Sequence, residues 1–133
     1  MVETEARVYF AIKTEDDLIE ESTISNYIGL KPTKFFKMHE KGNIPKCTSW
    51  QISTDKIKNP CVHNMIDNIL DVLSSCREKL IELKKEYPQV TYVLQIVIEH
   101  GDNAVGLGFD NNQLCLLSEI GALVDIDQYN YKD

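Results

Sequence analysis

The stretch from Cys61 to Tyr87 limits the possible folds of this chain more than any other, because its apolar residues recur at alternating steps of three and four. That period places them along one side of an α-helix, with charged and amide side chains on the opposite side. A helix with one apolar stripe needs an apolar surface beneath it, so the pattern predicts a helix packed on a β-sheet. The stripe consists of Val62, Met65, Ile66, Ile69, Leu73, Cys76, Leu80, Leu83 and Tyr87.

The ends of this stretch are better marked than its middle. Asn59-Pro60 supplies a cap and a first-turn proline, and Pro88 prevents the helix from continuing past Tyr87. A capping-box pattern at Ser75 and Glu78 indicates a bend, although the apolar phase runs through it. The sequence therefore leaves open whether the element is one helix or two.

Segments in which apolar and polar residues alternate predict β-strands elsewhere in the chain. We expect strands at 7–14, 48–54, 90–99 and 123–129, a short glycine-rich strand at 105–109, and either an edge strand or a long loop at 33–42. Short helices are expected to begin near Ser22 and after Asp110 and to end at Gly29 and Gly121. Glycine fits both ends because helices commonly close with a residue in the left-handed conformation.

The first and last thirds of the chain share one order of elements: a strand, a short helix ending in Ile-Gly, and a second strand. The order predicts a single α+β domain over 1–133 with two pseudo-duplicated β-α-β halves around the long helix. We expect a two-layer, ferredoxin-like sandwich in which helices cover one face of an antiparallel or mixed sheet. The other face, called the open face below, would then carry no helix.

Charge and hydropathy limit the kinds of binding partner and the cellular location that we expect for this protein. Fourteen basic and twenty-one acidic residues give a formal charge of −7, which opposes binding to phosphate backbones and anionic lipid. A partner attracted by charge should therefore be basic. No segment approaches the length of a membrane span, and the four cysteines lack paired spacing, so we expect a cytoplasmic protein with reduced thiols.

Strand parity predicts which side chains reach the open face. In the last strand Val124 and Ile126 are expected to face the helices, which turns the alternate residues outward. Carboxylates beside aromatic rings are typical of a protein-binding patch, and the alternative is an ordinary solvated face that discourages edge pairing. The expected set is Tyr9, Asp125, Asp127 and Tyr129, with Tyr131 extending the row.

Motifs of enzymes are absent from the sequence. It contains no Gly-x-Ser-x-Gly elbow and no phosphate-binding Gly-x-x-x-x-Gly-Lys loop. Cys61 and His63 could both bind a metal, but structural zinc sites use four ligands in recognisable pairs. We therefore expect no catalytic residue, no metal and no cofactor, and interpret His63 as a solvated side chain.

Two aromatic segments leave alternatives open. Trp50 shares a strand face with Ile52, which predicts a core position with an indole N–H that needs a partner, and a ligand-stacking role is the alternative. The lysine-rich segment 31–46 contains Phe35 and Phe36, a combination that suits stacking on single-stranded nucleic acid. The net negative charge favours a lysine-protected edge strand instead.

Several segments resemble a bacterial family known as domain of unknown function 4279. The family has no assigned activity, so the resemblance implies no catalytic residues. Its members resemble small acidic proteins found near bacterial contact-dependent toxins, which implies an immunity-type role by analogy. The resemblance is carried by Val8 to Phe10, Ile24 to Thr33, Lys41-Gly42, Thr48 to Trp50, and Ile120 to Tyr129.

These observations favour a non-enzymatic cytosolic binding protein, of which an immunity protein is one form, that binds a basic protein through the open face. The alternative is a small-ligand-binding domain or a weak enzyme with a pocket between Trp50, the lysine-rich segment and the sheet. Homodimer formation through the open face is compatible with either hypothesis.

Overall fold

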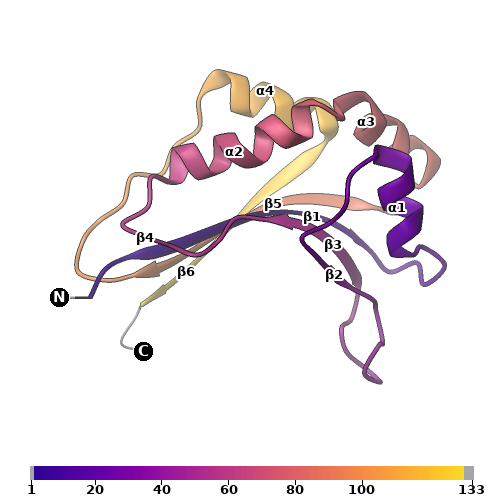
Figure 1. The fold of residues 1–133 in the computed structure, drawn as a ribbon, viewed down its shortest axis with the longest axis horizontal. Coiled ribbons are helices and arrows are strands. Elements are labelled where there is room, and N and C mark those ends of the chain that lie inside the picture. The colour runs from indigo at the N-terminus through magenta and orange to yellow at the C-terminus, as the bar shows by residue number, and fades with distance from the viewer. Residues whose placement is uncertain (1, 131–133) are drawn as a thin grey trace.

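The chain folds into two layers, with helices over one face of a β-sheet (Figure 1). The structure is a computed structural model that describes residues 2–130. The elements, in chain order, are β1 (Glu5–Thr14), α1 (Glu21–Ile28), β2 (Lys34–Phe36), β3 (Thr48–Ser53), β4 (Ile57–Lys58), α2 (Val62–Ser74), α3 (Arg77–Glu86), β5 (Thr91–His100), α4 (Asn111–Ile120) and β6 (Ala122–Asn130).

The sheet has the order β2-β3-β1-β5-β6, and the short strand β4 pairs with the beginning of β1. β1 runs antiparallel to both of its long neighbours, β3 and β5, whereas β5 and β6 are parallel. The predicted α+β class with a mixed sheet is therefore confirmed. The segment at 33–42 contains an edge strand of three residues, β2, followed by a loop.

In both β-α-β segments the strand after the short helix runs parallel to the strand before it. However, β3 lies between β1 and β2 whereas β5 and β6 are neighbours, so the predicted ferredoxin-like duplication is not confirmed. After α1 the chain forms β2 and then turns back as β3, which leaves β3 antiparallel to β1. After β5 the chain crosses over through α4 and returns directly as β6, which gives a parallel pair. The position of β3 between β1 and β2 is thus the difference between the two halves.

The long apolar stripe belongs to two helices. α2 and α3 are separated at Ser75 and Cys76, and the stripe continues across the break with Leu80 and Leu83 buried on α3. Ser75 does not cap α3, because its hydroxyl donates to the carbonyl oxygen of Val72 at 2.6 Å, and the predicted capping box is therefore wrong. The buried stripe of α2 consists of Val62, Met65, Ile66, Ile69, Leu70 and Leu73.

The short helices begin or end at residues that were predicted to cap them. Gly29 and Gly121 close α1 and α4 in the left-handed conformation, with φ of 78° and 73°. Asp110 and Gln113 form the predicted capping box of α4. The expected strand at 105–109 is absent, because this segment leads from the end of β5 to the helix layer rather than along another strand (Figure 1).

None of the helices in the described part of the chain has the length and apolar character needed to cross a bilayer. The longest, α2, has 13 residues and is apolar along one side only. The four cysteines are free thiols, of which Cys76 is buried and Cys47 partly buried, whereas Cys61 and Cys115 are exposed.

Candidate functional site

The four side chains predicted for the open face lie on the same side of the sheet. The strand register places Gln95 of β5 opposite both Tyr9 of β1 and Asp125 of β6. Directly opposed residues share a face, and alternation along β6 adds Asp127 and Tyr129 to it. The helices lie on the other side of the sheet, and Tyr129 is 56% exposed (Figure 1).

Tyr9 is electrostatically linked to both carboxylates of β6. Burial raises the pKa of Tyr9, the Arg7 guanidinium lowers it, and the charges of Asp127 and Asp125 raise it further. The Arg7 guanidinium lies 5.1 Å from the centre of the Tyr9 ring. Gln95 donates to Asp127 Oδ2 and to the backbone oxygen of Asp125, both at 3.2 Å. The row is therefore one connected cluster, whereas Tyr131 lies outside the described residues.

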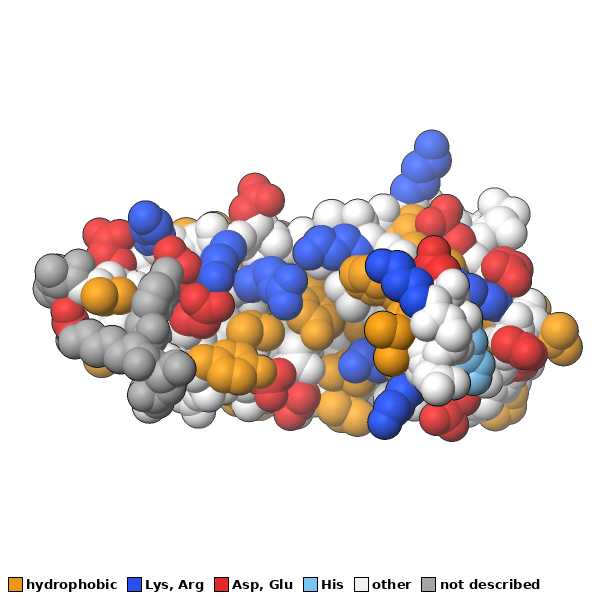
Figure 2. Space-filling view, turned by 90° about the horizontal axis from the view of Figure 1, so that it is seen from below, with side chains coloured by type: hydrophobic (Ala, Val, Ile, Leu, Met, Phe, Trp, Pro, Cys, Tyr) orange, Lys and Arg blue, Asp and Glu red, His pale blue; other side chains and the backbone are white. Residues whose placement is uncertain are grey.

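The centre of the open face holds apolar side chains of β1 and β5, of which Val93 lies opposite Ala11 and Val97 opposite Arg7. Ala11, Val93 and Gln95 are all buried there. Arg7 and Lys13 of β1 and Lys34 of β2 share this face through the strand register. Figure 2 shows Lys and Arg side chains running across its middle, with acidic side chains toward its margins. The face is therefore mixed in charge, with its exposed carboxylate row confined to β6.

A hollow of about 450 Å³ opens on the same face beside Arg7. Its lining includes Lys34, Lys56 and Ser53, and Lys56 is paired with Glu99 at 2.7 Å. Ser53 Oγ is the one buried side-chain polar atom without a hydrogen-bond partner among residues 2–130. Most buried polar atoms in folded proteins are paired, so this hydroxyl is an exception among the described residues.

The edge strand β6 is exposed on both of its faces. Val124 and Ile126 point toward the helix layer as predicted, but each remains 36% exposed because the helices do not extend fully over the edge strand. Leu123, on the open face, is 49% exposed. Apolar surface therefore continues around the strand that carries the two carboxylates.

Trp50 is completely buried, as its parity with Ile52 predicted, and its indole N–H donates to Ser25 Oγ at 3.0 Å. With no exposed surface, this side chain cannot line the ligand pocket of the alternative hypothesis. A larger hollow, of about 750 Å³, lies instead in the helix layer between α2, α3 and α4, and charged side chains form much of its lining. The pocket that the alternative hypothesis expects near Trp50 therefore stays a prediction that burial of this side chain does not support.

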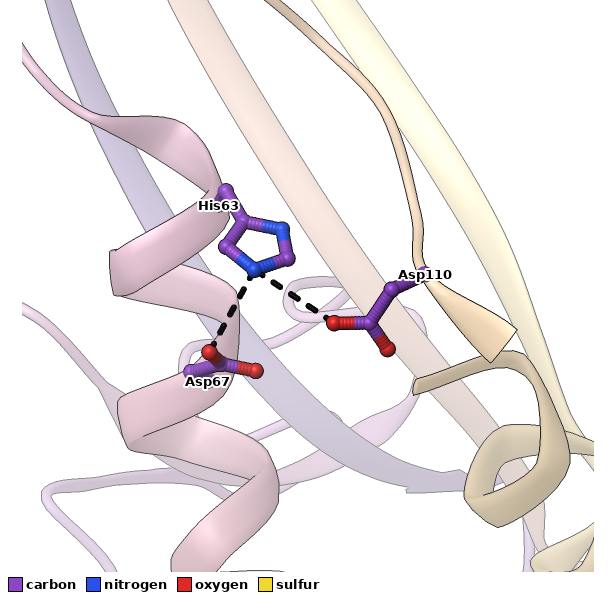
Figure 3. A group of neighbouring side chains, drawn as sticks. All are labelled: His63, Asp67 and Asp110. Carbon is purple, nitrogen blue, oxygen red and sulfur yellow. Dashed lines mark ion pairs between the residues drawn. The ribbon is translucent and has the colours of Figure 1, made fainter. Parts of the chain in front are cut away.

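A cluster that could bind a metal lies at the junction of α2 and α4 (Figure 3). His63 Nε2 is 3.5 Å from Asp67 Oδ2 and 3.4 Å from Asp110 Oδ2. Cys61, the other metal-capable residue considered from the sequence, is not in this group. Sequence reasoning missed the cluster. Its only local signal is the spacing of His63 and Asp67, which places both on one side of α2.

Comparison with known proteins identifies a family but no activity. The family model described as "Domain of unknown function (DUF4279)" matches residues 4–131, nearly the whole chain. No curated protein and no solved structure matches the chain.

Proposed function

The chain belongs to the DUF4279 family, and we propose that it is a non-enzymatic binding protein whose partner docks on the open face of the sheet. The observation that carries this proposal is the row of Tyr9, Asp125, Asp127 and Tyr129 on a face that no helix of residues 2–130 covers (Figure 1). Tyrosine rings supply contact area at interfaces and can hold a cation over their faces. Beside them, two carboxylates suit Lys or Arg side chains of a basic protein.

In its most specific form, the proposal is that the chain is an immunity-type protein of the cytoplasm that neutralises a basic protein. The formal charge of −7 supports this form, because complementary charge accelerates the encounter with a basic partner and disfavours acidic competitors.

The mixed charge of the open face favours one alternative occupant, a second copy of the chain. Carboxylates lie along β6, while Arg7, Lys13 and Lys34 lie on β1 and β2. Two copies related by a two-fold axis through this face could place the carboxylates of one against the cations of the other. The same face would then serve homodimer formation.

Affinity purification from the source cell tests the proposal with two variants of equal charge. Asp125→Lys with Asp127→Lys alters the open face, and Asp71→Lys with Glu78→Lys alters exposed positions of α2 and α3. We expect the unchanged protein and the helix variant to retain one partner protein, which the sheet variant loses. Recovery of no protein partner, or equal retention by both variants, would contradict the proposal.

Light scattering on the purified chain decides between the two occupants. A monomer is expected if the partner is a different protein. A dimer that the Asp125→Lys, Asp127→Lys variant abolishes would assign the face to a second copy, whereas a dimer that survives this variant must form elsewhere.

A further inference from the structure

We propose that His63, Asp67 and Asp110 form a binding site for a divalent transition-metal ion, zinc foremost. The three residues come from α2 and from the position that caps α4, and one ligand atom of each lies within 4.8 Å of the others. One imidazole nitrogen and two carboxylate oxygens form a mixed donor set that suits zinc and its neighbours in the first transition row.

The spacing of the ligand atoms fits a metal better than a direct ion pair. His63 Nε2 lies 3.5 Å and 3.4 Å from the two Oδ2 atoms, whereas a charge-assisted N–H···O bond is usually about 2.7–2.9 Å long. Zinc–nitrogen and zinc–oxygen bonds of about 2.0–2.2 Å at a tetrahedral angle put two ligand atoms roughly 3.4 Å apart. Both contacts to the imidazole agree with that separation.

Gln113 orients both carboxylates toward His63. Its side-chain amide donates to Asp67 Oδ1 at 2.8 Å, and its backbone N–H donates to Asp110 Oδ1, also at 2.8 Å. The remaining oxygen of each carboxylate is the one that faces the imidazole. Gln113 is only 3% exposed, and its Oε1 accepts from the Asp110 backbone N–H, so the amide is fixed. Such outer hydrogen bonds are what hold metal ligands in position.

The local charge also favours a cation. Among the described residues, the ion pairs of Asp67 and Asp110 are both with His63, and no Lys or Arg compensates these two carboxylates. The first turns of α2 and α4 contribute positive dipole ends, each equivalent to about half an elementary charge. Two full negative charges outweigh this contribution, so the cluster as a whole attracts a divalent ion.

Three protein ligands leave at least one coordination position for water or a small ligand. A hollow adjoins the cluster on this side, lined by His63, Asp110, Leu107 and Phe109 among others. The hollow gives space for that additional ligand. The site therefore differs from a closed four-ligand structural site.

Titration calorimetry with zinc chloride, and cobalt(II) absorption in the visible range, test the site on the purified chain. We expect one equivalent of zinc to bind and cobalt to give a tetrahedral spectrum. His63→Ala, Asp67→Asn and Asp110→Asn should each lower the affinity at least 10-fold, and Gln113→Leu should lower it about 10–100-fold. Asn is itself a good helix cap, so Asp110→Asn preserves the fold.

Two control variants separate this site from adventitious binding. His100→Ala removes a histidine outside the cluster, and Cys61→Ser removes the cysteine that is nearest to His63 in the sequence. Both are expected to bind zinc like the unchanged protein. Absence of stoichiometric binding, equal binding by folded His63→Ala, or loss of binding in Cys61→Ser would overturn the proposal.

Discussion

Three buried polar side chains each tie a helix to another part of the fold. The Trp50 indole reaches Ser25 on α1, the Tyr92 hydroxyl donates to the Leu80 backbone oxygen on α3 at 2.6 Å, and Gln113 joins α4 to α2. Parity predicted that Trp50 is buried and needs a partner. The identity of each partner was not predictable, because it lies on an element brought near only by the tertiary fold.

Replacing Tyr92 with Phe should weaken the protein at neutral pH and reduce its sensitivity to alkali. The change removes a buried hydrogen bond, at a cost of about 1 kcal/mol in the free energy of unfolding. Burial, and secondarily the charges of Cys76 and Tyr27, raise the pKa of Tyr92. In the unfolded chain tyrosine ionises near pH 10, whereas folded Tyr92 keeps its proton, so the free energy of unfolding should fall as the pH rises above about 10.

Urea unfolding followed by fluorescence of the single tryptophan, at about pH 8 and about pH 10.5, measures both effects. The alkaline loss of stability should be smaller in Tyr92→Phe than in the unchanged protein. Tyr129→Phe, at an exposed position, is the matched control. An equal loss in all three proteins would contradict the account of Tyr92.

At the scale of elements, local chemistry predicted the helix ends better than the break between helices. The two Ile-Gly pairs and the capping box at Asp110 act within a single helical turn, so they can be recognised from the sequence. The sequence leaves the break at Ser75 and Cys76 open, because the apolar stripe continues through it, and the capping-box pattern that indicates a bend does not form. The expected strand at 105–109 does not form. A strand needs the free edge of a neighbouring strand to pair with, and the local alternation of residues does not show whether such an edge is nearby.

The two helix-ending glycines should differ in their tolerance of alanine. Both have positive φ, so Gly29→Ala should cost about 1–2 kcal/mol of backbone strain. Around Gly29 no atom lies within 4 Å of an added Cβ, whereas at Gly121 that atom would lie 2.8 Å from Lys84 Nζ. This ammonium donates to the Gly121 oxygen at 2.6 Å, so Gly121→Ala should cost about 0.5–1 kcal/mol more.

Urea denaturation of the two variants measures the difference in the free energy of unfolding. Repeating both substitutions in a Lys84→Met background should make their costs equal, because the displaced ammonium is then absent. Equal costs in the original background would show that the contact between Lys84 and Gly121 contributes nothing.

At the scale of the whole molecule, a two-layer arrangement leaves one side of the sheet for binding. The placement of Tyr9, Asp125 and Asp127 followed from strand alternation, which depends only on local geometry. The cations on the same face and the cluster around His63 were not predicted. Each joins residues from separate segments, and Gln113 lies 46 positions from Asp67. The tertiary fold brings these residues together, and local patterns in the sequence do not contain that information.

Site-specific photo-cross-linking in the source cell tests the open face most directly. A benzophenone amino acid at position 129 samples the open face, and one at position 114 samples the helix layer, at similar exposures of 56% and 50% for Tyr129 and Leu114. We predict one discrete adduct with a protein partner from position 129, absent at position 114 and lost when Asp125→Lys and Asp127→Lys are added. Adducts only from position 114, equal adducts from both positions, or none from position 129 would contradict the assignment of the open face as the docking surface.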